Sequence, residues 1–190
     1  MEIASYAPAV RDLIAEAPLQ PLGPGRPIRE KRSALAALTP AQVAGESADD
    51  KLGRACLAGL WLLYNFTDES HALSQDLDTV EGSYWHAILH RREPDYWNSK
   101  YWFRRVGRHA IFGELARAAG EIALAPSCPA EGKYLVGQGT WDPFAFVDLC
   151  EKASHGPAGL EDLCRKVQQR EWELLFDHCA SNGRKRAAGS

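Results

Sequence analysis

The sequence has no long hydrophobic run, no strong charge of one sign and no leading signal segment. Its longest apolar run, residues 55–64, is about ten residues long, whereas a membrane-spanning helix needs about 20. The formal net charge of −3 argues against general binding to nucleic acid or to an anionic membrane. The first residues lack a basic segment followed by an apolar one, so we expect no secretory signal.

The cysteines form no recognisable framework. There are five, an odd number, and none stands in a C-x-x-C pair. Cys56, Cys150 and Cys164 lie among aliphatic residues, which is typical of buried reduced thiols. Reduced thiols and the missing signal together predict a cytoplasmic protein.

Strand-like alternation of apolar and polar residues is also missing, and no internal repeat is visible. Apolar residues recur instead at helical spacing, and 190 residues with 45% hydrophobic content suit one domain. We therefore predict an all-α helical bundle of about seven to nine helices in a single domain, residues 1–180, followed by a disordered tail, residues 181–190. The expected helices cover residues 7–17, 33–45 (one broken or two short), 49–66, 80–92, 95–106, 109–124, 143–150 and 157–179.

Two segments are expected to be irregular. Residues 18–32 carry four prolines and two glycines, which predicts an extended arm that either crosses the domain surface or hangs free. Residues 127–139 read as a loop, in which residues 133–136 suit a brief extended piece.

One stretch, residues 68–107, concentrates polar and aromatic chemistry. It holds half of the six tryptophans and half of the six histidines, which a helix built only for packing would not require. We expect a polar site there. These residues are Trp85, Trp97, Trp102, His71, His86 and His90.

Two of these histidines are one helical turn apart. On a helix over residues 80–92, His86 and His90 share a side with Gly82, which would leave room above the imidazoles. This i, i+4 spacing is how two imidazoles on one helix converge on a metal. The run HAILH lacks the glutamate of H-E-x-x-H, so it does not indicate a metalloprotease.

A third imidazole is available just before this helix. If residues 68–78 are helical, Asp68, His71 and Gln75 form one polar stripe. Three imidazoles with a nearby carboxylate suit zinc or ferrous iron with an open coordination position, and Asp68 or Glu69 would then accept a proton. Alternatively, Thr67 caps this helix, the two acids favour its N-terminus and the stripe faces water.

The second half of the stretch adds arginines to aromatic rings. Arg91, Arg92 and Arg105 interleave with Tyr-Trp pairs, and such a mixture can hold the anionic group of a small molecule. On the helix after residue 95, Asn98, Tyr101 and Arg105 share a stripe.

The same arginines have an alternative use. They can pair with Glu81, Glu93 and Asp95 in an internal salt-bridge network. The predicted site comprises metal ligands His71, His86 and His90, catalytic carboxylates Asp68 and Glu69, and ligand-binding residues Gln75, Arg91, Arg92, Tyr101 and Arg105.

The sequence runs resemble an uncharacterised family of small bacterial and fungal proteins. The matching runs are DESHALSQ, GSYWHAILHRREPDYWNSKYWFRRVG and WDPFAFVDLCE, and the resemblance covers about residues 55–151. It implies no activity, and it carries over only the residues within these runs: Asp68, Glu69, His71, Gln75, Trp85, His86, His90, Arg91, Arg92, Glu93, Asp95, Tyr101, Trp102, Arg104 and Arg105.

Three functions remain open from the sequence. The first is a protein that binds a divalent metal or a small anionic ligand, as a hydrolase or oxidoreductase. The second is a non-catalytic binding module for an anionic metabolite or, less in keeping with the charge, nucleic acid. The third is a purely structural protein, including one that forms homo-oligomers; no membrane partner is expected.

Overall fold

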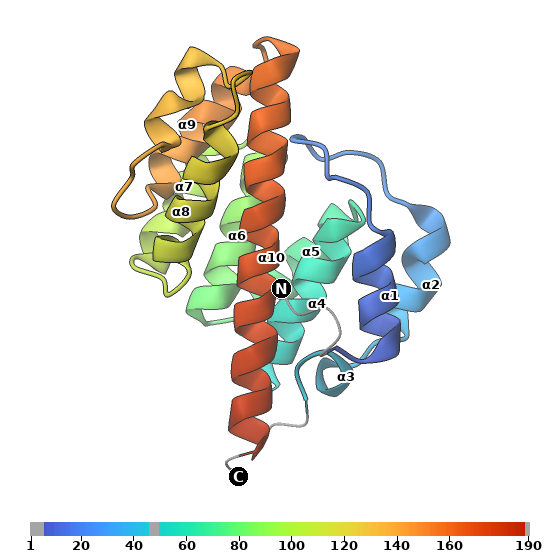
Figure 1. Ribbon diagram of the computed structural model, residues 1–190. Coiled ribbons are helices and arrows are strands. Elements are labelled where there is room, and N and C mark those ends of the chain that lie inside the picture. The colour runs from blue at the N-terminus through green and yellow to red at the C-terminus, as the bar shows by residue number, and fades with distance from the viewer. Residues whose placement is uncertain (1–5, 46–49, 189–190) are drawn as a thin grey trace.

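The computed structural model describes residues 6–45 and 50–188, with side chains described to residue 182. Within these ranges the chain folds into α-helices and two short 3-10 helices without any strand, so the all-α prediction is confirmed (Figure 1). No helix in the described part of the chain is both long enough and apolar enough to cross a bilayer. The helices are α1 (Pro8–Glu16), η2 (Arg29–Lys31), α2 (Arg32–Ala36), α3 (Pro40–Ala44), α4 (Lys51–Leu63), α5 (Thr67–Gln75), α6 (Val80–Arg92), α7 (Tyr96–Val106), α8 (Phe112–Ala123), η3 (Ala130–Leu135), α9 (Pro143–Ala153) and α10 (Ala158–Ala188).

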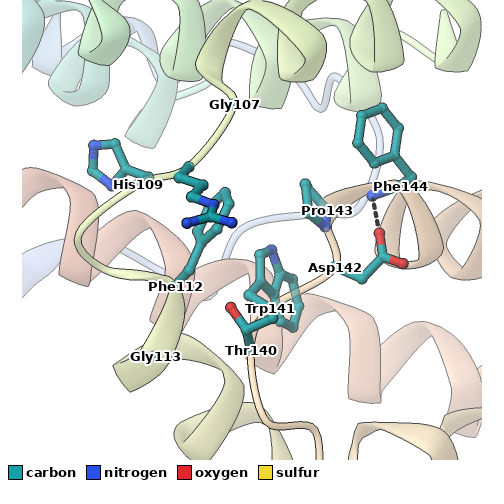
Figure 2. Close-up of a pocket in the computed structure, with 10 residues that line it drawn as sticks. Gly107, His109, Phe112, Gly113, Thr140, Trp141, Asp142, Pro143 and Phe144 are labelled. Carbon is teal, nitrogen blue, oxygen red and sulfur yellow. Dashed lines mark hydrogen bonds between the residues drawn. The ribbon is translucent and has the colours of Figure 1, made fainter.

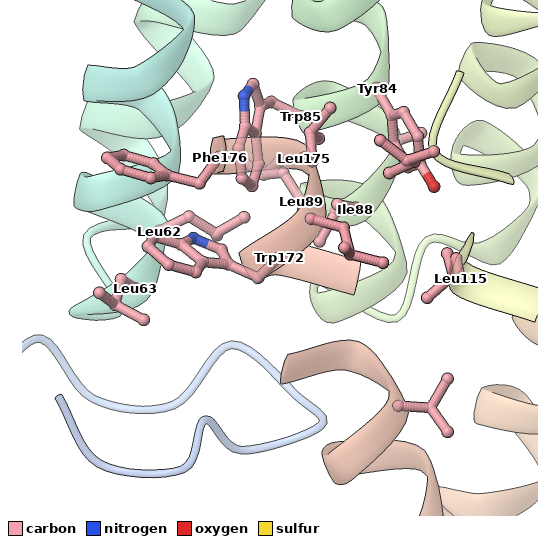
Figure 3. Packing of buried hydrophobic residues seen from close by; sticks show 14 of the residues in the cluster. Leu62, Leu63, Tyr84, Trp85, Ile88, Leu89, Leu115, Trp172, Leu175 and Phe176 are labelled. Atoms are coloured by element: carbon pink, nitrogen blue, oxygen red, sulfur yellow. The ribbon is translucent and has the colours of Figure 1, made fainter. Parts of the chain in front are cut away.

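The last helix, α10, runs through the middle of the molecule (Figure 1). Figure 1 shows α10 running the length of the fold, with α7, α8 and α9 to one side and α1 to α5 to the other. Its apolar stripe enters the core shown in Figure 3, where Trp172 stacks on Phe176 with ring centroids 4.9 Å apart. The indole N–H of Trp172 donates to the carbonyl of Gly59 at 2.8 Å, which fixes α10 against α4.

Helix α6 lies deep in the interior and turns sharply into α7. Gly59 on α4 makes room for it, because a Cβ at Gly59 would lie 2.7 Å from the ring of Trp85. At the turn the Asp95 N–H donates to the His90 carbonyl at 2.9 Å, and the Asp95 carboxylate caps α7 by accepting from the Asn98 N–H at 3.2 Å. The α6–α7 pair therefore forms a fixed hairpin around the predicted polar site.

Arg91 is completely buried at the end of α6. Its guanidinium pairs with Glu171 of α10, and the Tyr84 hydroxyl donates to the same carboxylate at 3.1 Å. Burial pushes the pKa of Arg91 down, but the charge of Glu171, its hydrogen bond and smaller contributions from Cys150 and Tyr84 together outweigh burial, so the net pKa is raised. The pair is a structural link between α6 and α10.

Arg92 is equally buried but has no carboxylate partner among the described residues. Its guanidinium donates to the carbonyl oxygens of Gly23, Pro24 and Leu62 at 3.1, 3.3 and 2.7 Å, and also to the side chains of Gln20 and Asn65. Burial and then the neighbouring charge of Arg91 lower its pKa to about 9, which leaves it protonated at neutral pH. Because Arg92 binds Gln20, Gly23 and Pro24, the proline-rich arm lies across the domain surface and does not hang free.

The structure corrects three local expectations. Residues 133–136 are not extended; they belong mostly to η3, which brings Leu135 into the core. Residues 181–188 are not disordered but continue α10, because arginine, lysine and alanine favour helix and Gly183 alone does not stop it. Thr67 is not a cap, since the N-cap position of α5 is Phe66.

Replacing Arg92 by methionine should detach the arm from the core. Several buried acceptors would lose their donor, so we expect the free energy of unfolding to fall by at least about 3 kcal/mol. Urea denaturation measures the loss, and limited proteolysis should show faster cleavage within residues 18–28. The matched control is Arg104→Met, at an exposed position on α7; equal stability of the two variants would contradict the role of Arg92.

Candidate metal centre

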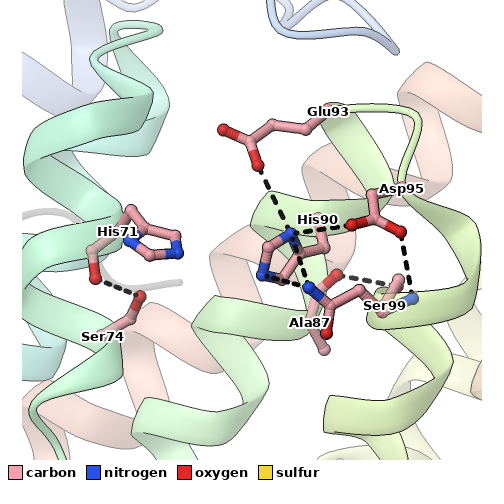
Figure 4. A network of polar contacts seen from close by, with 8 residues as sticks. His71, Ser74, Ala87, His90, Glu93, Asp95 and Ser99 are labelled. Atoms are coloured by element: carbon pink, nitrogen blue, oxygen red, sulfur yellow. Dashed lines mark hydrogen bonds and ion pairs between the residues drawn. The ribbon is translucent and has the colours of Figure 1, made fainter.

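Three imidazoles from two helices meet at one place. His71 of α5 faces His86 and His90 of α6, with ring centroids 4.6 Å from His86 and 5.6 Å from His90. Each ring offers one nitrogen such that all three nitrogens lie within 4.8 Å of one another. Figure 4 shows the ring of His71 turned toward His90 across the gap between the helices. The predicted convergence of the three rings is therefore present.

His86 is the most enclosed of the three. Only 3% of its surface is exposed, and its ring is sandwiched between Trp102 of α7 and His90, with centroids 4.0 and 4.7 Å away. Burial, with smaller contributions from His90 and His71, lowers its pKa to about 3. Its buried Nδ1 has no hydrogen-bond partner among the described residues. His86 is thus neutral and keeps an unsatisfied ring nitrogen.

His90 is oriented by polar groups of the α6–α7 turn. Its Nδ1 lies 3.4 Å from Glu93 Oε2 and 3.9 Å from Asp95 Oδ2 (Figure 4). Its Nε2 lies 3.1 Å from Asn98 Nδ2. Burial lowers the pKa of His90, opposed by Asp95 and reinforced by His71. Carboxylates beside Nδ1 favour the tautomer with the proton there, so Nε2 carries the lone pair, as in many metal-ligating histidines. A metal would take this lone pair in place of the Asn98 amide.

Glu93 lies beside His90, and Asp68 lies on α5 three residues before His71. Burial raises the pKa of the Glu93 carboxyl; the charge of His71 opposes this rise, and those of Asp68 and Asp95 add to it. Asp68 itself is exposed on the first turn of α5. Trp102 therefore covers the centre on one side, and Glu93 approaches it from the α6–α7 turn.

The other predicted site residues have different surroundings. Glu69 forms an ion pair with Arg32. Gln75 is exposed at the end of α5. Arg91 and Arg92 serve the core contacts described above, and neither pairs with Glu81, Glu93 or Asp95. Gly82 leaves no room for a ligand, since a Cβ there would lie 2.5 Å from Leu77 Cβ.

Tyr101 and Arg105 contact Trp102, the ring that stacks on His86. The Arg105 guanidinium lies 5.3 Å from the centroid of Trp102, the ring that covers His86, and 4.0 Å from Asp78. Tyr101 contacts Trp102 edge-on at 5.5 Å. Of the predicted anion-binding arginines, Arg105 alone is exposed beside the site, with its side chain 49% accessible.

Sequence reasoning missed two contacts. The stacking of Trp102 on His86 follows from the sharp α6–α7 turn. No residue pattern in the sequence predicts the geometry of this turn. The contact of Asn98 with His90 has the same origin, although the shared stripe of Asn98, Tyr101 and Arg105 marked Asn98 as a polar contributor.

Comparison with known protein families, with curated proteins and with solved structures gave no match for this chain. The centre is therefore interpreted from its own geometry.

The neutral state of His86 predicts an acid-sensitive metal-free protein. Its pKa is about 3 when folded and near 6.5 when unfolded, so between these values the unfolded chain binds more protons. The stabilising contribution is complete above pH 6.5 and is lost as the pH falls. In His86→Gln the free energy of unfolding should change less with pH between 4 and 6, by up to about 1.4 kcal/mol per pH unit.

The measurement is urea denaturation in chelator at several pH values. His155→Gln, a change at an exposed histidine outside the cluster, should keep the slope of the original protein. An unchanged slope in His86→Gln would show that His86 is not held neutral.

Proposed function

We propose that this protein binds a divalent transition metal, zinc or ferrous iron, through His71, His86 and His90, and acts there on a small anionic molecule by hydrolysis or oxidation. The observation that carries the proposal is that three ring nitrogens lie within 4.8 Å of one another, although two of the rings are buried. The resemblance to an uncharacterised family stays a prediction and adds no activity.

A metal accounts for what packing alone leaves unexplained. Burying an imidazole nitrogen without a partner costs free energy, and His86 Nδ1 is in that state. Placing a second and third imidazole beside it lowers the pKa of His86 further and offers no compensating acid. A divalent cation prefers neutral imidazoles, and it would form bonds to the ring lone pairs, including one at His86 that has no partner among the described residues.

The surrounding residues would divide the remaining tasks. A three-histidine set leaves a coordination position open, and the metal would supply Lewis acidity there. Glu93 holds the Nδ1 side of His90 and thereby its ring orientation. Asp68, exposed next to His71, is the carboxylate best placed to accept a proton from a reacting group on the open side. Glu69 is less suited, because Arg32 already pairs with it.

Arg105 is proposed to hold the anionic group of the substrate. It is the exposed cation beside the Trp102 ring that covers the centre, whereas Arg91 and Arg92 are sealed in the core. Tyr101, which is 40% exposed, adds a hydroxyl on the same face of α7. The arrangement favours a small carboxylate or phosphate over a nucleic acid, since it offers one cation rather than a basic surface.

Removing one imidazole should remove one bound metal ion. We choose His71→Ala because His71 is only half-buried and its loss leaves α6 intact. Protein purified without an affinity tag and loaded with zinc should lose one equivalent in this variant, because two ligands hold the ion far more weakly than three. Equilibrium dialysis followed by elemental analysis gives the stoichiometry. His155→Ala should bind as much zinc as the original protein; an unchanged stoichiometry in His71→Ala would refute the centre.

Arg105→Gln should weaken the binding of anions near the metal. Loss of one charge-assisted contact costs about 1.4 kcal/mol, which is a tenfold rise in the dissociation constant of acetate. The shift in the visible absorption of the cobalt-loaded protein on addition of acetate measures this binding. Arg104→Gln, an exposed arginine at the neighbouring position, is the matched control. Equal affinities for the two variants would remove Arg105 from the site.

A further inference from the structure

A second group of metal-ligating side chains lies outside the centre described above. Glu81 of α6, His109 of the segment between α7 and α8, and His178 of α10 each offer one ligand atom, and these atoms lie within 4.8 Å of one another. We propose that they form a second divalent-metal site, with two imidazoles and one carboxylate as its ligands. The three residues come from distant parts of the sequence, and only the fold brings them together.

The contacts within the group are short and come from three sides. His178 Nε2 lies 3.5 Å from Glu81 Oε1, and the rings of His109 and His178 have centroids 4.7 Å apart. Tyr84 holds the ring of His109 from the side, edge to face at 5.1 Å. Asn182, one turn further along α10, lies 3.1 Å from His178 Nε2. The ligands are thus supported by neighbours that fix their orientation.

His109 has a nitrogen that no protein group satisfies. Its Nε2 is buried and has no hydrogen-bond partner among the described residues. Its Nδ1 accepts a long bond, 3.4 Å, from the backbone N–H of Ile111. A metal at Nε2 requires the proton to sit on Nδ1, so the site would exchange this weak bond for a metal–nitrogen bond.

The charges suit a cation. Glu81 supplies a carboxylate whose Oε1 lies 3.5 Å from His178 Nε2, and His109 and His178 supply two imidazoles. One anionic oxygen and imidazole nitrogens match the ligands of ferrous-iron sites that keep open positions.

The two groups are separate but share helix α6. Glu81 precedes His86 by five residues and His90 by nine, so at about 100° per residue it points roughly 140° and 180° away from them. Each site therefore lies on its own side of the helix, and no ligand belongs to both. Of the six histidines in the sequence, only the exposed His155 stands outside the two groups.

The second site lies near a cavity of about 630 Å³. His109 and Phe112 line one side of this cavity, and Trp141 and Phe144, at the start of α9, line another (Figure 2). Figure 2 shows the ring of His109 turned away from the cavity, toward the second site.

Cobalt titration of protein purified without an affinity tag tests the proposal. Visible absorption and equilibrium dialysis should show two equivalents bound to the original protein and to His155→Ala. One equivalent should remain in His109→Ala, in Glu81→Gln and in His71→Ala, and none in the double variant His71→Ala/His109→Ala. Glu81→Gln keeps the size of the side chain, so it decides the matter if His109→Ala does not fold.

The outcomes separate the two sites. A single equivalent that disappears in His71→Ala and persists in Glu81→Gln overturns the second site and supports the first. A single equivalent that disappears in Glu81→Gln and persists in His71→Ala does the reverse. Unchanged binding in both Glu81→Gln and His109→Ala, with circular dichroism showing folded protein, also overturns the second site.

Discussion

Helix α6 is buried along nearly its whole length, and this burial constrains the rest of the molecule. From Gly82 to Arg92 every residue is removed from solvent, although the segment carries histidines, arginines, a serine and a tyrosine. Each polar side chain must therefore find its partner inside the protein or remain unsatisfied at a cost. The helices and the arm that surround α6 are arranged largely to supply those partners.

The arginines and the histidines of α6 meet this constraint in opposite ways. Arg91 has a carboxylate, although its Nε and Nη1 have no hydrogen-bond partner among the described residues, and Arg92 has backbone carbonyls and two amide side chains. The histidines have each other and the ring of Trp102, and His90 also has Glu93 and Asn98. Arginine contacts thus explain the attachment of α10 and the arm. The imidazole cluster has no such structural role among the described contacts, and it is the basis of the proposed metal site.

Helical periodicity was sufficient to predict the elements and part of the site. The i, i+4 spacing of His86 and His90 and the polar stripe of α5 predicted that His71 would join them, because two consecutive helices joined by a short turn pack together. Sequence could not distinguish Arg91 and Arg92 from Arg105. All three stand beside aromatic residues, and the partners that bury two of them lie far away along the chain: Glu171 for Arg91, and the segment around Gly23 for Arg92.

Contacts between distant segments account for the remaining differences. Glu81, His109 and His178 carry no motif, since their spacing along the chain reflects the path of α7 to α10 rather than any local geometry. The prediction that Gly82 leaves room for a ligand was wrong for a similar reason. Gly82 is on the side of α6 that the helical projection gives, but Leu77, from the turn before α6, fills the space beside it. A helical projection predicts the direction in which a side chain points, but it does not predict which residues of other segments lie there.

The direction of approach to the first centre follows from these packing facts. Trp102 covers His86 on one face, and the α6–α7 hairpin closes the side of His90 that Asn98 contacts. His71 is the least buried imidazole, and Asp68 beside it is exposed. In the proposed function, a reactant that approaches from the α5 side would pass Asp68 at the start of α5 and Glu93 at the end of α6. Arg105 lies beside Trp102 and Asp78, toward the other end of α6, so it would hold an anionic group away from these two acids.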